Sequence, residues 1–136
     1  MIDLYTWATP NGRKISILLE EINTPYLVHP VNIVENEQFS DEFSRIAPSN
    51  KIPAIIDRDN GQSIFESGAI MMYLAKKHNQ FLSQKHYWQI MEWVIFQLSQ
   101  VGPVLGQAHQ FLYYHPNQSE LVEKNILIIQ NEFIKH

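Results

Sequence analysis

Residues 3–21 read DLYTWATPNGRKISILLEE, and this stretch decides the fold. The β-forming residues from Ile2 to Trp7 predict a buried strand, and Pro10 and Gly12 mark the turn that follows it. Apolar residues then recur at the spacing of one helix face: Ile15, Leu18, Leu19 and Ile22. Redox proteins of this strand-turn-helix design place a cysteine at the helix N-terminus, where the backbone favours thiolates. This chain has no cysteine, so thiol chemistry at the turn has to use a substrate's sulfur.

The rest of the first half continues to alternate between strands and helices. Pro30 suggests that the next strand lies at a sheet edge, and DRDNG at residues 57–61 carries a hairpin signal. The predicted elements are a strand at 26–32, a short irregular helix at 35–47, a strand at 52–56, a return strand at 62–65 and a helix from 66 to about 78. The order βαβαββα with a proline before the third strand predicts an α/β domain of thioredoxin-like arrangement.

The second half is helical in character. Residues 87–101 are apolar on nearly every side, which predicts a helix that is buried all round or lies in a subunit interface. Trp88, Trp93 and Phe96 on this helix are expected to serve core or dimer packing, with a wall of the substrate pocket as the alternative. We expect Gly102-Pro103 and Gly106 to bend or break the helix, and Ser119 to begin a last one. The predicted domains are therefore 1–79 and 85–136, joined by a linker at 79–84.

Composition excludes several classes of function. Hydrophobic residues make up 45% and the net charge is −4, and the ten Lys and Arg residues are scattered, so we expect no nucleic-acid partner. The N-terminus lacks a basic segment followed by a long apolar run, so we expect no signal peptide, no membrane association and a cytoplasmic location. The six histidines show no close ligand spacing, so we expect no metal.

Four motifs, ATPNGRKI, SNKIPAIID, FESGAI and GPVLGQ, resemble those of glutathione S-transferases. The resemblance is to the Nu-class and yeast prion-regulator-like group, which includes glutathione-dependent disulfide-bond oxidoreductases. It covers the whole chain and implies a thioredoxin-like N-terminal domain followed by an incomplete all-α C-terminal domain. Because family members continue through several more helices, we expect a C-terminally truncated chain; a natural short form, a remnant and a cut sequence all stay open.

The same resemblance implies a glutathione site. Pro53 matches the family's cis-proline, which leaves the backbone of Ile52 free to pair with the cysteinyl part of glutathione. Glu66 and Ser67 match the pair that holds the γ-glutamyl end. The glycyl carboxylate is expected near two further residues, Lys51 and Gln38.

Thr9 and Asn11 match positions beside the glutathione sulfur and are the expected catalytic residues. The Thr9 hydroxyl, the Asn11 amide and the free N–H groups of the first helical turn are expected to stabilise a glutathione thiolate. Lys124 stands where relatives tend to have an arginine, so it is a possible contact that lacks the planar guanidinium fork. Gln107 is a further possible site residue.

Plainer interpretations stand beside these roles. Thr9 can simply cap the first helix, and Lys51 can be a solvated loop charge. Glu66 and Ser67 can be a first-turn acid and a cap. Tyr5 lies inside the strand rather than at the turn, so it is expected in the core and not as a catalytic tyrosine.

The favoured function is glutathione-dependent disulfide-bond reduction, with glutathione as co-substrate and a small disulfide as the second substrate. The alternatives are glutathione transfer to an electrophile and a non-catalytic binding module; a decayed gene product that barely folds is a further possibility. The family also implies a homodimer, with part of the interface surviving in residues 66–101.

Overall fold

The alternating elements at the front of the chain form one mixed sheet. The computed structural model describes residues 1–110 and residue 124, divided into an N-terminal unit, Met1–Tyr87, and a second unit that begins at Trp88. The sheet order is β2-β1-β3-β4; β1 and β2 are parallel, and the other two pairings are antiparallel. The elements of the N-terminal unit are β1 (Ile2–Thr6), α1 (Pro10–Glu21), β2 (Tyr26–Pro30), α2 (Asp41–Ile46), β3 (Ala54–Asp57), β4 (Gln62–Phe65) and α3 (Ser67–His78).

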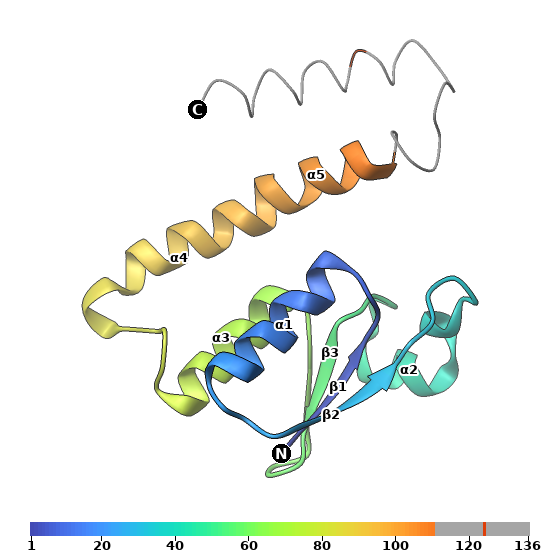
Figure 1. Ribbon diagram of the computed structural model, residues 1–136, viewed down its shortest axis with the longest axis horizontal. Coiled ribbons are helices and arrows are strands. Elements are labelled where there is room, and N and C mark those ends of the chain that lie inside the picture. The colour runs from blue at the N-terminus through green and yellow to red at the C-terminus, as the bar shows by residue number, and fades with distance from the viewer. Residues whose placement is uncertain (111–123, 125–136) are drawn as a thin grey trace. The chain divides into compact units, whose positions relative to one another are not determined.

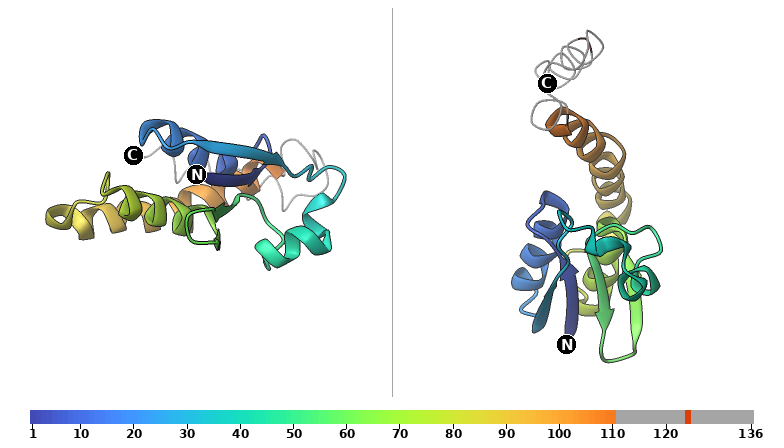
Figure 2. Two further views of the ribbon diagram at one scale, coloured as in Figure 1. Left: turned by 90° about the horizontal axis from the view of Figure 1, so that it is seen from below. Right: turned by 90° about the vertical axis from the view of Figure 1, so that its right-hand side faces the viewer.

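Helices cover both faces of this sheet, α1 and α3 on one and α2 on the other (Figure 1, Figure 2). Side chains alternate along β1, so Ile2 and Leu4 join the α1–α3 face. That face holds the larger core, which also contains Ile15, Leu19, Ile22, Ile55, Ile70 and Leu74. Tyr5 points to the α2 face, where it packs partly buried against a smaller cluster around Phe43. The thioredoxin-like arrangement predicted from the sequence is therefore present, and Tyr5 takes the packing position expected of it.

Several predicted boundaries are wrong by a few residues. The strand predicted at 26–32 ends at Pro30, and the strand predicted at 52–56 runs from Ala54 to Asp57. The predicted helix at 35–47 is a short 3₁₀ turn, Glu37–Phe39, followed by α2. Ser40 explains that break, because its extended backbone and its hydroxyl, which accepts from the Phe43 N–H at 3.2 Å, begin a new helix.

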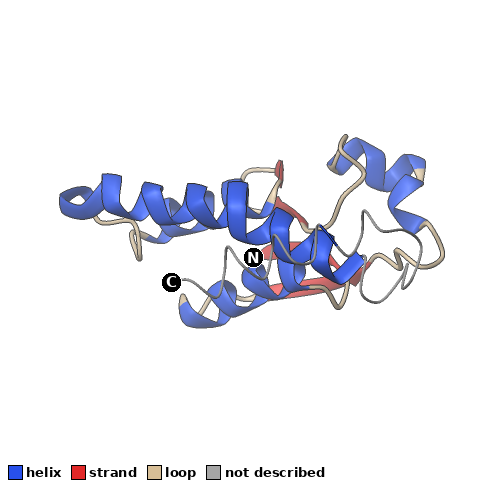
Figure 3. Cartoon of the chain, turned by 90° about the horizontal axis from the view of Figure 1, so that it is seen from above, coloured by secondary structure: helices blue, strands red, loops and turns tan. Residues whose placement is uncertain are grey.

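The second unit contains a longer helical run than the sequence predicted (Figure 3). After the 3₁₀ turn Gln84–His86, α4 (Tyr87–Phe96) passes through a π-helical turn, Gln97–Val101, into α5 (Gly102–His109). The sequence predicted a bend or a break at Gly102-Pro103; the helical run does not break there, and the irregularity is the π-helical turn just before these residues. The Gly102 N–H bonds to the Gln97 carbonyl, five residues earlier, and Pro103 follows this π-helical turn in the first turn of α5.

The apolar surface of α4 is not buried within the described part of the chain. Trp93 is 71% exposed, and its ring meets the edge of Phe96 with centroids 5.8 Å apart. The sequence predicted that this helix is either buried all round or part of a subunit interface. Burial all round is wrong for the described residues. The helix expected from Ser119 lies outside them. None of the described helices is long and apolar enough to cross a membrane.

Candidate functional site

Strand register brings most of the predicted site residues to one end of the sheet. Ala54 at the start of β3 pairs with Tyr5 near the end of β1 and with Phe65 at the end of β4. The turn after β1, the loop before β3 and the start of α3 therefore meet at this edge. Because β2 is parallel to β1, with Pro30 opposite Thr6, the segment toward Gln38 leaves at the same edge. We call this edge the β3-entry edge.

The N-terminus of α1 provides few open donors at this edge. Thr9 is the N-cap, and its Oγ1 accepts from the Gly12 N–H at 3.2 Å. Its own N–H donates to the Trp7 carbonyl at 2.7 Å, and Pro10 has none to offer. In the described residues this leaves the Asn11 N–H as the open backbone donor of the first turn, rather than the several that we expected. The capping interpretation of Thr9 is thus realised, while its hydroxyl hydrogen remains available.

The side chain of Asn11 is oriented by a neighbour on the next turn. Its Oδ1 accepts from Lys14 Nζ at 2.8 Å, so the amide nitrogen is the free end. Burial lowers the pKa of Lys14. An exposed amide whose oxygen is already occupied presents N–H donors, which is the polarity that a thiolate requires.

Gly12 is a positioning residue that the sequence analysis did not single out as such. A Cβ at this position would lie 2.6 Å from the carbonyl oxygen of Trp7 and would also clash with Thr6 Oγ1. The missing side chain lets the first turn of α1 approach the end of β1 closely. A glycine at the third position of a helix is a visible sequence signal, but the close approach behind it requires the structure.

In the loop before β3, the side chain of Ile52 is packed while its backbone polar groups are unpaired among the described residues. The Ile52–Pro53 peptide bond is cis, as the motif implied. The Ile52 side chain packs against the cluster around Phe43, while no hydrogen bond engages its backbone N–H or C=O among the described residues. Asn50, with φ of 52°, accepts from Ser44 Oγ at 2.7 Å and fixes the loop. Lys51 is exposed, with no ion pair in the described part of the chain.

The start of α3 combines an unusual backbone with open N–H groups. Glu66 has φ of 68° and ψ of 120°, a conformation that costs a non-glycine residue on the order of 1–3 kcal/mol. Its exposed side chain does not cap the helix. Ser67 is 6% exposed, and the first hydrogen bond of the helix runs from the Ile70 N–H to the Glu66 carbonyl. The N–H groups of residues 67–69 are therefore open among the described contacts and form a helix N-terminus suited to a carboxylate.

Gln38 carries a buried acceptor without a donor. Its Oε1 is shielded from solvent and has no hydrogen-bond partner in the described residues. Buried polar atoms are nearly always paired, so this oxygen is an unmet acceptor in the segment that follows β2. Gln107, in α5, and Lys124 belong to the second unit, and both are exposed. The structure does not place them with the β3-entry edge, so their part in the site stays a prediction.

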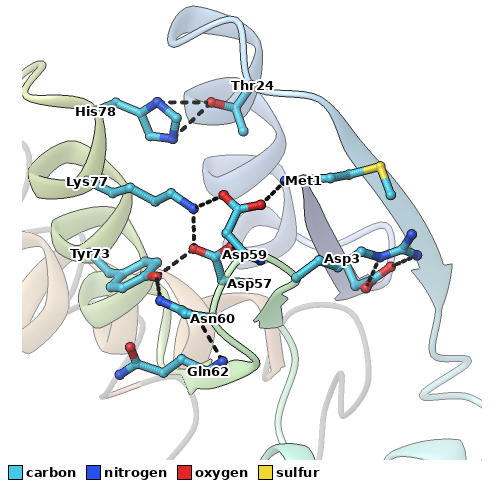
Figure 4. A network of polar contacts seen from close by, with 11 residues as sticks. Met1, Asp3, Thr24, Asp57, Asp59, Asn60, Gln62, Tyr73, Lys77 and His78 are labelled. Atoms are coloured by element: carbon cyan, nitrogen blue, oxygen red, sulfur yellow. Dashed lines mark hydrogen bonds and ion pairs between the residues drawn. The ribbon is translucent and has the colours of Figure 1, made fainter.

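A polar network occupies the opposite end of the sheet (Figure 4). Asp57, fully buried and paired with Ile2, accepts from Tyr73 Oη at 2.6 Å and from Lys77 Nζ. Burial raises the pKa of Asp57, but the hydrogen bonds from Lys77 and Tyr73 outweigh it and hold that pKa below its usual range. Lys77 also pairs with Asp59. The network ties the hairpin to α3 and is structural. No cluster of three or more metal-ligating side chains occurs among the described residues.

The sheet order, the proline before β3 and the two helix N-termini at one edge define a thioredoxin-like domain. A model of the glutathione S-transferase N-terminal domain matches residues 1–76, and the chain belongs to the glutathione S-transferase family. The resemblance drawn from the four sequence motifs is therefore confirmed.

The similarity to individual known proteins covers more of the chain than residues 1–76. The disulfide-bond oxidoreductase YfcG of Escherichia coli is 46% identical over 123 residues, which cover 85% of this chain and 57% of the relative. The protein URE2 of Candida albicans is 38% identical over 117 residues, covering 79% of this chain and 34% of the relative. A Pseudomonas putida glutathione transferase, solved with one glutathione disulfide bound per subunit, superposes with a TM-score of 0.85 at 37% identity over 99% of this chain and 64% of its own. The chain thus spans about a third to about two-thirds of the length of these proteins.

Proposed function

We propose that this chain binds glutathione at the β3-entry edge and uses it to reduce a disulfide. The observation that carries the proposal is the set of unpaired polar groups toward that edge: the open α3 N-terminus, the Ile52 backbone, the buried Gln38 Oε1 and the Asn11 donors. A tripeptide with a carboxylate at each end and a thiol between them matches these groups. The similarity to a disulfide-bond oxidoreductase and to a transferase holding glutathione disulfide supports it.

The assignment of each part of glutathione follows from polarity. The open N–H groups at the start of α3 and the Ser67 hydroxyl receive the γ-glutamyl carboxylate, and Glu66 accepts from the adjacent ammonium. The strained backbone of Glu66 presents its side chain at the surface beside the helix N-terminus. The backbone of Ile52, ahead of Pro53, pairs with the cysteinyl residue in the manner of an added strand.

The two remaining contacts concern the glycyl end. Gln38 Oε1 accepts a backbone N–H of the ligand, and its amide nitrogen donates to the glycyl carboxylate. Lys51 contributes charge to the same carboxylate from an exposed position.

The sulfur then lies at the α1 turn, where the Asn11 amide and N–H and the Thr9 hydroxyl donate to the thiolate. The thiol proton leaves to solvent, and the thiolate attacks one sulfur of the substrate disulfide. A glutathione–substrate disulfide forms while the other substrate sulfur leaves as thiolate and takes up a proton. A second glutathione thiolate attacks the mixed disulfide, which releases the second substrate thiol and glutathione disulfide. The electron pair comes from two glutathiones, so no protein cysteine is required.

The test is turnover of bis(2-hydroxyethyl) disulfide with reduced glutathione, followed as glutathione disulfide formed. Ser67→Ala is expected to raise the KM for glutathione about tenfold, because it removes a hydrogen bond to a charged group. Ser63→Ala, a serine in the neighbouring exposed strand β4, is the matched control and should leave KM unchanged. A KM that does not respond to Ser67→Ala would argue against the assigned γ-glutamyl site.

A transferase acting on electrophiles is the second candidate, because the same stabilised thiolate can attack an electrophilic carbon. Conjugation of 1-chloro-2,4-dinitrobenzene without disulfide turnover would favour it. A non-catalytic module is favoured by the exposed apolar surface of α4, which includes Trp93 and Ile95. The expected homodimer interface, residues 66–101, includes this helix. Glutathione binding without turnover of either substrate would favour the module.

A further inference from the structure

A cavity lies on the α2 face of the sheet, and the proposed glutathione chemistry does not use it. Its volume is about 380 Å³. Tyr5 and His29, on neighbouring strands, line it together with residues that lead into α2, so we call it the Tyr5–His29 cavity. Its lining residues are Tyr5, His29, Pro30, Val31, Glu37, Ser40, Glu42 and Phe43.

The aromatic wall of this cavity is held in place before any ligand arrives. The rings of Tyr5 and His29 stack with centroids 4.6 Å apart and planes 14° from parallel. His29 Nε2 is hydrogen-bonded to Asp3 Oδ1 at 2.7 Å, and the Arg58 guanidinium donates two hydrogen bonds of 2.6 Å to the same carboxylate. Because these rings are already held in place, a ligand that packs on them binds without a further loss of their side-chain conformational entropy.

Two acidic side chains also line the cavity. Glu37 and Glu42 are the two carboxylates of the lining, and no lysine or arginine is among the lining residues. Glu37 is fixed, because its Oε2 accepts from the Asn32 N–H at 2.6 Å. Glu42 makes no hydrogen bond or ion pair within the described residues. Burial raises the pKa of Tyr5, the charges of Asp3 and Glu42 raise it further, and the charge of Arg58, which is paired with Asp3, lowers it.

We propose that the Tyr5–His29 cavity binds a small organic cation, a primary ammonium group on a short aromatic or aliphatic body. The ammonium lies between Glu37 and Glu42, and the body packs on the Tyr5–His29 wall. A concave site with an apolar wall and a few converging polar groups suits a small ligand, and the aromatic face adds a cation–π attraction. The proposal does not depend on glutathione binding.

The test is an NMR titration of the full ¹⁵N-labelled chain with 2-phenylethylammonium. Its neutral counterpart, 2-phenylethanol, serves as the ligand control. The ammonium is expected to bind saturably, with shifts centred on residues 29–43, and the alcohol about tenfold more weakly or worse. Glu42→Gln keeps the shape of the side chain and should weaken ammonium binding about tenfold.

Glu35→Gln is the matched control variant, since Glu35 is exposed in the same segment but does not line the cavity. It should bind the ammonium as the unaltered chain does. The proposal is overturned if the ammonium does not saturate in the millimolar range. Equal binding of the alcohol, or equal weakening by Glu35→Gln and Glu42→Gln, overturns it as well. The amide spectrum recorded in the same titration shows whether each variant is folded.

Discussion

Asn11→Ala is the substitution that bears most directly on the proposed sulfur site. Asn11 is exposed and its Oδ1 is engaged by Lys14 at 2.8 Å, so the variant loses one surface contact and should keep its stability within about 0.5 kcal/mol. What it removes from the site is one amide donor to a thiolate. A hydrogen bond to a charged group contributes about 1.5–3 kcal/mol. One pKa unit corresponds to about 1.4 kcal/mol, so the pKa of the bound glutathione thiol should rise by about 1–2 units.

The effect on rate is smaller than the effect on thiolate population. A rise of 1–2 units lowers the thiolate fraction near neutral pH by about 10- to 100-fold, while the more basic thiolate that remains is a better nucleophile. With a Brønsted coefficient of about 0.45, disulfide reduction should fall only about 3- to 10-fold. The assay is a pH titration of the ultraviolet absorbance of the thiolate in the complex, alongside the initial rate of disulfide reduction.

S-Methylglutathione separates a sulfur contact from general binding, since it cannot form a thiolate. Its affinity should be the same for Asn11→Ala and for the unaltered chain. Gln80→Ala, which removes an exposed amide outside the site, should change neither the thiol pKa nor the rate. An unchanged thiol pKa in Asn11→Ala would contradict the proposed contact between Asn11 and the thiolate. If Asn11→Ala weakened the binding of S-methylglutathione as much as that of glutathione, the contact of Asn11 would lie elsewhere on the ligand.

Three further predictions concern the scaffold. Thr9→Val removes the hydroxyl that caps α1 and should lower the free energy of unfolding by about 1 kcal/mol in urea denaturation, whereas Thr9→Ser should not. Gly12→Ala forces a Cβ against a backbone carbonyl 2.6 Å away and should cost about 1–3 kcal/mol, whereas Gly106→Ala, with open space around it, should be neutral or stabilising. Arg58→Gln removes the chief cause of the low pKa of Asp3, about 2, and should move acid unfolding to higher pH.

The sign of the last prediction follows from the direction of the shift. The pKa of Asp3 is lower in the folded chain than its ordinary value of 3.8, so the stabilisation is present above that value. It is lost as the pH falls toward about 2, where the folded carboxyl takes up its proton. Without Arg58 the pKa of the folded carboxyl is no longer held this low, so the stabilisation is smaller above pH 3.8 and the chain should unfold at a higher pH on acidification. Arg45→Gln, at an exposed arginine of α2, is the control, and an equal shift there would attribute the effect to net charge instead.

The sheet and its first helix could be predicted from local signals. The hairpin at residues 57–61 and the return strand Gln62–Phe65 follow from turn chemistry, and α1 follows from the spacing of Ile15 and Leu19. The continuation of α4 into α5 was missed, because the π-helical turn that accommodates Pro103 depends on a bond from Gly102 to Gln97 rather than on propensity.

For the site residues, the motifs predicted the positions in the chain but not the hydrogen bonds that the side chains make. Register brings Ile52 and Glu66 to the same sheet edge, in agreement with the motif-based expectation. The structure was needed to show that Thr9 Oγ1 accepts from the Gly12 N–H and that a side chain at Gly12 would clash with the end of β1. The clash depends on how closely α1 approaches β1, a tertiary distance that local sequence does not encode. The unpaired Gln38 Oε1 is likewise visible only once the loop is folded.

The central claim is that the β3-entry edge binds glutathione. The most direct measurement is calorimetric titration of the folded, monodisperse chain with reduced and then with oxidised glutathione. The account predicts saturable binding of both forms, and weaker binding of both by Ser67→Ala. A folded, monodisperse chain that binds neither form would contradict it.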